Sequence, residues 1–300
     1  MDLLLHLCVM ISIYIIFAMS LNLEVGYTGL FNFGHVAFFG IGAYTSALLT
    51  LQRVPFELSL VAALVMAGLC GFLLSLPSLR LRGDYFGMAT LGFGEIIRIV
   101  FQNEVWLTKG PMGLPGIPKP TLFTIRFATL PHYLILVMGL GALTFFILRM
   151  ILRSPFGRVL KAIREDELAA ESLGKNVFRF RVKSFVIGSI FAGLAGTLWG
   201  HYTTFISPGD FTLLETILVL LIVVLGGKGT EWGPVLGAVV LIFFQESLRF
   251  LKLPSEWTRY LAPLQQMIFG GLLVLFMIYR PEGLIRDKGR KADAGNQGNQ

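Results

Sequence analysis

Long apolar blocks recur along almost the whole chain, and they limit its possible folds more than any other feature. A hydrocarbon core about 30 Å thick is crossed by roughly 20 helical residues. The blocks that approach this length are 3–21, 35–51, 57–77, 85–101, 130–152, 184–204, 212–227, 233–250 and 263–280. The sequence therefore predicts an all-α, polytopic helical membrane protein of about nine spans, within a range of eight to ten.

The amino-acid composition excludes the main alternatives. Hydrophobic residues make up 55% of the 300 residues and charged residues only 14%, whereas a soluble domain has roughly 25% charged residues. An outer-membrane barrel is excluded because its strands alternate apolar and polar residues. The four histidines are scattered, and neither an H-E-x-x-H nor a G-x-S-x-G motif occurs. No catalytic residue, metal site or bound cofactor is therefore expected, and the chain is not predicted to be an enzyme.

Lysine and arginine residues gather in two of the segments outside the spans. Segment 153–183 holds eight of them, and the stretch after the last span holds five. Cytoplasmic loops are enriched in these residues, so we expect both segments in the cytoplasm, with the N-terminus outside and the C-terminus inside. The net charge of +7 then reflects membrane topology and does not indicate a nucleic-acid partner. Residues 1–286 form the expected membrane domain, and the polar stretch 287–300 is expected to be a disordered cytoplasmic tail.

A glycine-rich segment between the first two spans, residues 22–35, carries polar residues at membrane depth. Irregular backbone at that depth survives only inside protein or along a wet cavity. Broken helices also form substrate sites in transporters, because their ends offer free backbone groups. The candidate pathway residues are Asn22, Gly26, Tyr27, Gly29, Asn32, Gly34 and His35. The alternative is close helix packing through small residues, and a second glycine-rich break at 226–234 fits either interpretation.

Segment 153–183 contains the most informative stretch outside the spans. Residues 158–174 form an incomplete apolar stripe, with Glu167 and Glu171 one turn apart and Gly174 as a helix stop. A short exposed helix here is expected to have nothing of its own chain to pack against, so it is a natural docking element for a cytoplasmic partner. The alternative is a solvated loop whose charges only set the topology.

Three acidic residues lie within or near the predicted spans. Glu95 and Arg98 are three residues apart in one span and are expected to pair, because charges inside a membrane are usually paired or functional. Glu24 and Glu215 lie near the ends of predicted spans, where we expect water to reach their carboxylates. The external loop 102–129 contains a stretch, residues 106–118, that is rich in glycine and proline. An ordered cluster of turns without strand or helix is expected there, and it either receives an extracytoplasmic partner or caps the pore.

Several blocks, in one order, carry a resemblance to a known family. They are residues 20–23, GYTGLFNFGHVAFFGIGAYT (26–45), 84–98, 108–118, 158–174, 205–211 and 280–284. Over about residues 14–286 the chain resembles the M-type permease subunits (LivM) of branched-chain amino acid ABC importers. The run Asn32-Phe33-Gly34-His35 is similar to the M type rather than to the sister H type.

The resemblance implies a subunit of a heteromeric importer in a bacterial inner membrane. Its implied partners are a second, H-type permease, two cytoplasmic ATP-binding subunits that hold ATP and Mg²⁺, and a periplasmic substrate-binding protein. Segment 158–174 resembles the coupling loop of such permeases, whose pattern has Glu-Ala-Ala followed by Gly. The resemblance thereby implies ATPase coupling by Glu167, Ala170, Glu171 and Gly174. The implied mechanism is alternating access, driven by ATP on the partner subunits.

Other functions fit parts of the same pattern. Relatives of this family import urea or short amides, so the motifs leave the substrate open. A stand-alone transporter driven by an ion gradient needs a deep, unpaired acid, for which Glu95 is the best candidate. A membrane-embedded structural subunit without a pathway is disfavoured by the polar, glycine-rich breaks.

Overall fold

The computed structural model describes residues 2–79, 81, 84–122, 125–249 and 283–285, together with 267, 270–271, 274–275 and 278–279. The elements in these residues are, in chain order, α1 (Asp2–Thr28), α2 (His35–Leu51), α3 (Phe56–Ser78), α4 (Asp84–Asn103), α5 (Val105–Thr108), the 3₁₀ turn η1 (Gly110–Met112), β1 (Leu114–Pro115), β2 (Thr121–Leu122), β3 (Ile125–Arg126), α6 (Leu130–Arg153), α7 (Pro155–Glu165), α8 (Glu167–Ser172), α9 (Val177–Thr203), β4 (Phe205–Ile206), the 3₁₀ turn η2 (Pro208–Asp210), α10 (Leu213–Gly226) and α11 (Gly233–Arg249).

The expected all-α polytopic fold class is confirmed. Among the described residues, five helical segments are long and apolar enough to cross a membrane, namely Leu3–Thr28, Phe56–Ser78, Leu130–Arg153, Val177–Thr203 and Pro208–Gly226. Two apolar helices, at His35–Leu51 and Gly233–Glu246, are shorter. The expected last span, 263–280, and the tail 287–300 lie outside the described residues except for isolated positions.

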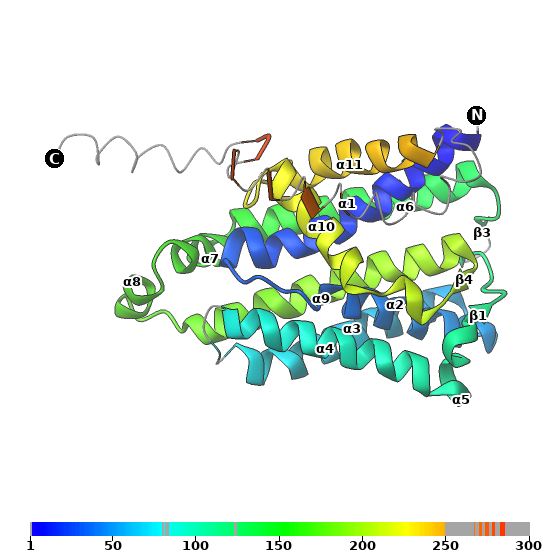
Figure 1. The fold of residues 1–300 in the computed structure, drawn as a ribbon, viewed down its shortest axis with the longest axis horizontal. Helices are drawn as coiled ribbons and strands as arrows, with labels where there is room; N and C mark the ends of the chain where they lie inside the picture. The colour runs from blue at the N-terminus through cyan, green and yellow to red at the C-terminus, as the bar shows by residue number, and fades with distance from the viewer. Residues whose placement is uncertain are drawn as a thin grey trace.

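The long helices run side by side along one axis (Figure 1). α9 packs against α1, α2 and α3, so the middle of the bundle is built around it. The pair α7 and α8 lies at one end of the bundle, whereas α5, the short strands and the N-terminus lie at the other (Figure 1). The external loop and the N-terminus therefore share one end, opposite the basic segment 153–183.

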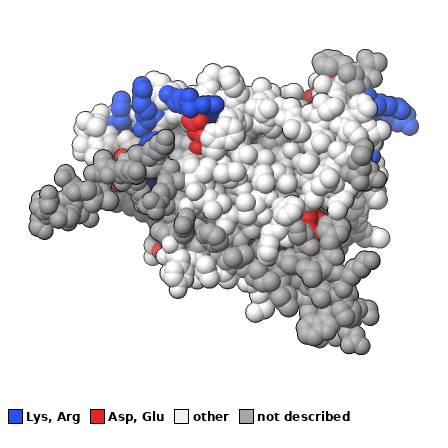
Figure 2. All heavy atoms as spheres, turned by 90° about the horizontal axis from the view of Figure 1, so that it is seen from above, with Lys and Arg blue, Asp and Glu red and all other residues white. Residues whose placement is uncertain are grey.

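Charged side chains follow the same division. On the face seen in Figure 2, Lys and Arg side chains lie toward the two ends, and most of the surface between them is uncharged. A broad uncharged band flanked by cationic ends is the pattern that a bilayer selects, because hydrocarbon excludes charge and the headgroup region accepts it.

Glycines allow a very close crossing between α2 and α9. A Cβ atom at Gly42 of α2 would lie 2.1 Å from the carbonyl oxygen of Gly193, and one at Gly196 of α9 would lie 1.8 Å from the carbonyl oxygen of Phe39. The backbones of α2 and α9 therefore approach so closely that only glycine fits. This is the packing that small residues give to membrane helices.

Two sequence-based expectations are corrected here. The first helix continues to Thr28 instead of ending near residue 21, because the backbone that stops it lies at Gly29. The glycine- and proline-rich stretch 106–118 is not a cluster of turns alone: it contains most of α5 and the strand β1. β1 pairs antiparallel with β4, with Leu114 opposite Ile206, and both of these side chains are buried. The partner strand is distant in the chain, so local turn signals did not reveal it.

Candidate functional site

Residues 29–34, which connect α1 to α2, are not helical and lie within the predicted break. Gly29 has φ of +73°, a left-handed conformation that favours glycine, and α1 ends just before it. The Glu24 carbonyl accepts hydrogen bonds from the Thr28 hydroxyl at 2.5 Å and the Leu30 amide at 3.2 Å. These bonds tie the last turn of α1 to the residues that follow it.

A buried polar cluster joins the two sides of this break. The Asn32 amide donates to Glu24 Oε2 at 2.7 Å, and His35 Nδ1 lies 3.5 Å from Glu24 Oε1. Ser20 Oγ lies 2.8 Å from His35 Nε2. The side chains of Glu24 and His35 are 0% exposed. The expectation that water reaches Glu24 is therefore wrong: α9 covers it, and a Cβ at Gly188 would lie 2.2 Å from Glu24 Oε1.

A second polar contact joins α1 to the break at 226–234. The Asn22 side chain donates to the Thr230 carbonyl at 3.0 Å and accepts from the Gly229 amide at 2.9 Å. Gly26 lies against the same turn, since a Cβ there would lie 2.4 Å from the Gly229 nitrogen. One amide side chain thus satisfies both polar groups of an irregular turn that is far away in the sequence.

The helix α7 reaches this junction from the end of the bundle. Arg164 Nη1 donates to the Gly26 carbonyl, and a Cβ at Gly229 would lie 2.3 Å from the same Nη1 atom. Lys161 Nζ lies 5.4 Å from the centre of the Tyr27 ring, a distance typical of a cation–π contact. The segment expected to dock a partner is therefore in direct contact with the end of α1.

The structure separates the candidate pathway residues into two groups within one interior region. Asn22 and Gly26 meet at Gly229, whereas Asn32 and His35 meet at Glu24. Asn22, Gly26, Tyr27, Asn32, Gly34 and His35 are buried within the chain, and Gly29 is exposed. Their contacts are the close packing considered as the alternative, and a pathway role stays a prediction. Sequence reasoning missed Ser20, Glu24 and Arg164 as parts of this region.

Local capping explains why segment 153–183 forms two helices and not one. The Ser154 hydroxyl accepts from the Phe156 amide at 3.2 Å at the start of α7, and Asp166 Oδ1 accepts from the Ala169 amide at 2.9 Å at the start of α8. Asp166 has extended backbone angles, φ −150° and ψ 107°, so the helix must restart there. Gly174 has φ of +74° and follows the end of α8, as its role of helix stop requires.

The apolar residues of this segment fall into two groups, one buried against the bundle and one exposed. Leu160 and Ile163 of α7 and Ala170 of α8 are buried, and the last two pack with Val177 at the start of α9. The expectation that this segment has nothing of its own chain to pack against is therefore wrong. Leu168 and Leu173, by contrast, are 68% and 79% exposed. These two leucines are apolar groups left uncovered at the projecting end of the bundle (Figure 1).

An ion pair holds α8 in place. Arg181 of α9 donates to both carboxylate oxygens of Glu167, at 2.7 and 3.0 Å, and such bidentate pairs fix geometry as well as charge. Glu171 is exposed on the same short helix. Of the four residues expected to couple to a partner, Glu167 and Ala170 therefore anchor α8, Gly174 ends it, and Glu171 remains on its surface.

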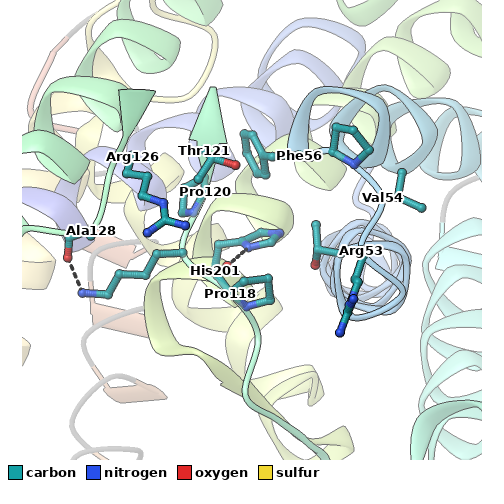
Figure 3. Close-up of a pocket in the computed structure, with 12 residues that line it drawn as sticks. Arg53, Val54, Phe56, Pro118, Pro120, Thr121, Arg126, Ala128 and His201 are labelled. Carbon is teal, nitrogen blue, oxygen red and sulfur yellow. Dashed lines mark hydrogen bonds between the residues drawn. The ribbon is translucent and has the colours of Figure 1, made fainter. Parts of the chain in front are cut away.

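The opposite end of the bundle carries a pocket with a volume of about 520 Å³. His201 lies in its floor and is fixed from both sides, because Nε2 lies 2.8 Å from Ser46 Oγ and Nδ1 lies 2.7 Å from the Pro118 carbonyl. Arg53, Lys119 and Arg126 also line the pocket, as does Phe56 (Figure 3). Lys119 Nζ donates to the Ala128 carbonyl at 2.6 Å. The charged residues that line this pocket are therefore all basic.

Fold and site together define a polytopic α-helical membrane protein, with two glycine-rich breaks between helices joined in its interior and a helical pair projecting from one end (Figure 1). The family model for the permease component of branched-chain amino acid transport systems matches residues 3–277. The chain belongs to this family. It is a transport permease subunit and not an enzyme, in agreement with the sequence-based expectation.

Curated relatives support the M-type resemblance. The chain is 40% identical to the high-affinity branched-chain amino acid transport system permease protein LivM of Escherichia coli K12, over 91% of this chain and 68% of that protein. It is 29% identical to the probable LivM permease protein of Methanocaldococcus jannaschii, over 96% and 94% of the two chains. Identity to the LivH permease protein of Escherichia coli K12 is 26%, over 91% of each chain. No solved structure matches the chain.

Proposed function

We propose that this chain forms one half of the translocation pathway of an ATP-driven importer for branched-chain amino acids. The other half is a second, H-type permease. Two cytoplasmic ATPase subunits bind ATP and Mg²⁺ and dock at segment 153–183, and a periplasmic binding protein delivers the amino acid at the opposite end. The chain lies in a bacterial inner membrane, with its N-terminus outside and its C-terminus in the cytoplasm.

The observation that carries this proposal is the construction of α7 and α8. Leu168 and Leu173 face outward, while Leu160 and Ile163 bind the pair to the bundle. Exposed apolar side chains on a rigid support are typical of a docking surface. Arg164 then links this surface to the end of α1, so a movement imposed on α7 and α8 by an ATPase reaches the two glycine-rich breaks directly.

Two further features support the orientation and the energy source. The basic pocket with Arg53, Lys119 and Arg126 lies at the end opposite α7 and α8, where a binding protein with an acidic surface fits. Glu95 is paired with Arg98, so it is not the unpaired acid that an ion-coupled transporter needs. The pair makes ATP on partner subunits the better-supported source of energy.

The first experiment is a pull-down of the full chain from its native membrane in mild detergent, with partners identified by mass spectrometry. We expect a second permease and ATPase subunits, and ATP-dependent uptake of leucine, isoleucine or valine once the complex and its binding protein are in proteoliposomes. Recovery of the chain alone, with solute uptake that does not need ATP, overturns the proposal. Uptake of urea or a short amide in place of amino acids overturns the assigned substrate only.

Docking is tested with a matched pair of substitutions. Leu168→Asp places a charge on the proposed contact, and we expect at least about tenfold weaker retention of the ATPase subunits, as for a hot-spot residue. Leu107→Asp makes the same change at an exposed leucine of α5, at the other end of the bundle, and is expected to retain the ATPase subunits. Equal retention by both variants excludes α8 as the docking element.

A further inference from the structure

The helix α4 carries an ion pair close to its middle. Arg98 Nε donates to the two carboxylate oxygens of Glu95 at 3.1 and 3.0 Å, and Arg98 Nη1 lies 3.4 Å from Gln102 Oε1. α4 has 20 residues, which at about 1.5 Å per residue equals the thickness of the hydrocarbon core. α4 is not among the five helices that are apolar enough to span a membrane by themselves, but it runs alongside them (Figure 1). Glu95 is less than one helical turn from the centre of α4, so the pair lies about midway along the bundle.

The pair is on the side of α4 that faces away from the rest of the described chain. The opposite side packs on the break between α1 and α2: the Phe33 amide donates to Thr90 Oγ1 at 3.1 Å, and a Cβ at Gly34 would lie 2.0 Å from the Thr90 carbonyl. The Glu95 and Arg98 side chains are 47% and 27% exposed. α4 runs along the side of the bundle opposite α11 (Figure 1).

A charged group at this depth is costly when lipid surrounds it, even within a pair. Membrane proteins therefore turn such groups toward other protein or toward a wet cavity. The described part of the chain covers the Thr90 side of α4 but not the Glu95 side. The Glu95 side of α4 is therefore expected to face other protein or a wet cavity in the assembled importer, and not lipid.

The side chains around the pair have a particular chemistry. Leu91, Ile96 and Ile99 are exposed beside Glu95 and Arg98. Gly92, one turn before Ile96, has no atom of the described chain within 4 Å of a Cβ position, so there is room above the helix there. The surface thus combines one acid, one guanidinium and several aliphatic side chains around an open position. We call Leu91, Gly92, Glu95, Ile96, Arg98 and Ile99 the α4 strip.

We propose that the α4 strip lines the translocation pathway and binds the amino acid in transit. This inference rests on the proposed function. Glu95 pairs with the ammonium group of the ligand, Arg98 with its carboxylate, and the aliphatic residues contact its branched side chain. The neighbouring opposite charges of Glu95 and Arg98 match the ammonium and carboxylate groups that an amino acid carries on its α-carbon. A guanidinium group binds a carboxylate in a bidentate manner.

The pairing of Glu95 with Arg98 also explains how such a site releases its ligand. In the empty pathway each charge is satisfied by the other, so no charge is left unpaired. The ligand exchanges one ion pair for two contacts of the same type, and its net gain is small. A site of this kind offers a stepping point in a pathway, whereas tight binding belongs to the binding protein that delivers the ligand.

The first test asks whether the strip faces water, lipid or protein. In a background without Cys8 and Cys70, I96C and I135C proteins are assembled into the full complex and treated with a membrane-impermeant maleimide. Ile96 and Ile135 are similarly exposed, at 60% and 67%, but Ile135 lies on α6. We expect rapid labelling of I96C and slow labelling of I135C. Equally slow labelling of the two proteins places the strip in lipid or in a subunit contact and overturns the proposal.

The second test measures transport by the full complex in proteoliposomes with the loaded binding protein. We expect Glu95→Gln and Arg98→Gln each to lower amino acid uptake at least tenfold, with assembly and basal ATP hydrolysis as in the wild type. Asp84→Asn, in the first turn of the same helix, serves as the matched control and is expected to transport normally. The double exchange E95R/R98E keeps an ion pair but reverses its order along the strip, so uptake is expected to stay low.

Three results overturn the proposal. They are wild-type uptake by both Gln variants, full rescue by the double exchange, which indicates a structural pair, and loss of the second permease from either Gln variant, which indicates a subunit interface. The wild-type complex tests the proposed function separately. If it takes up no amino acid, the proposed function fails and the ligand assigned to the strip fails with it, whereas uptake by the wild type with unchanged Gln variants removes the strip alone.

Discussion

Arg164 of α7 donates a hydrogen bond to the Gly26 carbonyl of α1, and its guanidinium packs against Gly229 in the second glycine-rich break. This contact joins the projecting helical pair to the end of α1 and to the turn between α10 and α11. A single side chain thereby connects the surface proposed to receive an ATPase with the interior of the membrane domain.

The first prediction concerns this connection. Arg164→Ala removes the donor to Gly26 while leaving Leu168 and Leu173 in place, so the ATPase subunits are expected to bind but transport-coupled ATP hydrolysis to fall at least about tenfold. Arg158→Ala changes an exposed arginine of the same helix and is the control. The measurement is ATP hydrolysis with and without loaded binding protein in proteoliposomes. Normal stimulation in R164A shows that coupling follows another route.

The second prediction concerns the anchor of α8. Glu167→Arg places two cations together where Glu167 now pairs with Arg181, and we expect loss of coupled ATP hydrolysis although the chain still inserts. The double variant E167R/R181E restores an opposite pair and is expected to recover much of the activity. Coupled ATP hydrolysis of the single and double variants distinguishes a lost pair from a lost contact with the ATPase, because the second case shows no recovery.

Gly174 gives a third prediction with a conformational cause. Proline is restricted to φ near −65°, so Gly174→Pro cannot keep the φ of +74° and is expected to abolish coupling. Gly174→Ala retains access to this region at a cost of about 1–2 kcal/mol and is expected to be milder, since no described atom lies within 4 Å of a Cβ there. Wild-type coupling in G174P is the result that contradicts the assigned role.

A fourth prediction tests the buried cluster around Glu24. Gly188→Ala brings a Cβ to 2.2 Å from Glu24 Oε1 and forces the cluster to shift, so we expect a loss of about 1–3 kcal/mol in the free energy of unfolding. Gly139→Ala is the control, because no described atom lies within 4 Å of its Cβ position. Thermal unfolding of the purified chain in one detergent compares the two, and equal midpoints show that the cluster is loosely packed.

The fifth prediction addresses Asn22. Asn22→Ala leaves the buried Thr230 carbonyl and Gly229 amide without their partner, and each unsatisfied group costs about 1–3 kcal/mol. Asn22→Asp keeps the acceptor for Gly229 but loses the donor to Thr230 and places a carboxylate beside that carbonyl in a buried site. Its unfolding midpoint is therefore expected to lie below that of N22A. A reversed order of N22A and N22D in thermal unfolding contradicts the assigned hydrogen bonds.

Much of the fold follows from patterns that are local in the chain. The apolar blocks predict the membrane helices, and the glycines around residue 29 predict the first break. The pair Glu95 and Arg98 is likewise confirmed, because one helical turn determines it. In each case the relevant residues are neighbours along one helix, so spacing alone brings them together.

The residues that make up the site were harder to predict from the sequence, because their contacts join segments that are far apart in the chain. Asn22 binds residues 207 and 208 positions away, and nothing in the local pattern selects that partner. The same holds for Leu114 and Ile206 in the strand pair. In segment 158–174, periodicity detected a stripe but not that Asp166 restarts the helix and sends its two halves in different directions.

The joining of the two breaks limits how the chain can move. Because Asn22, Gly26 and Arg164 hold the end of α1, the turn at Gly229 and α7 in mutual contact, these parts are expected to travel together as a rigid body during a transport cycle. The hinge then lies outside these three segments, and spectroscopic distance probes placed on two of them are expected to record a constant separation through the cycle.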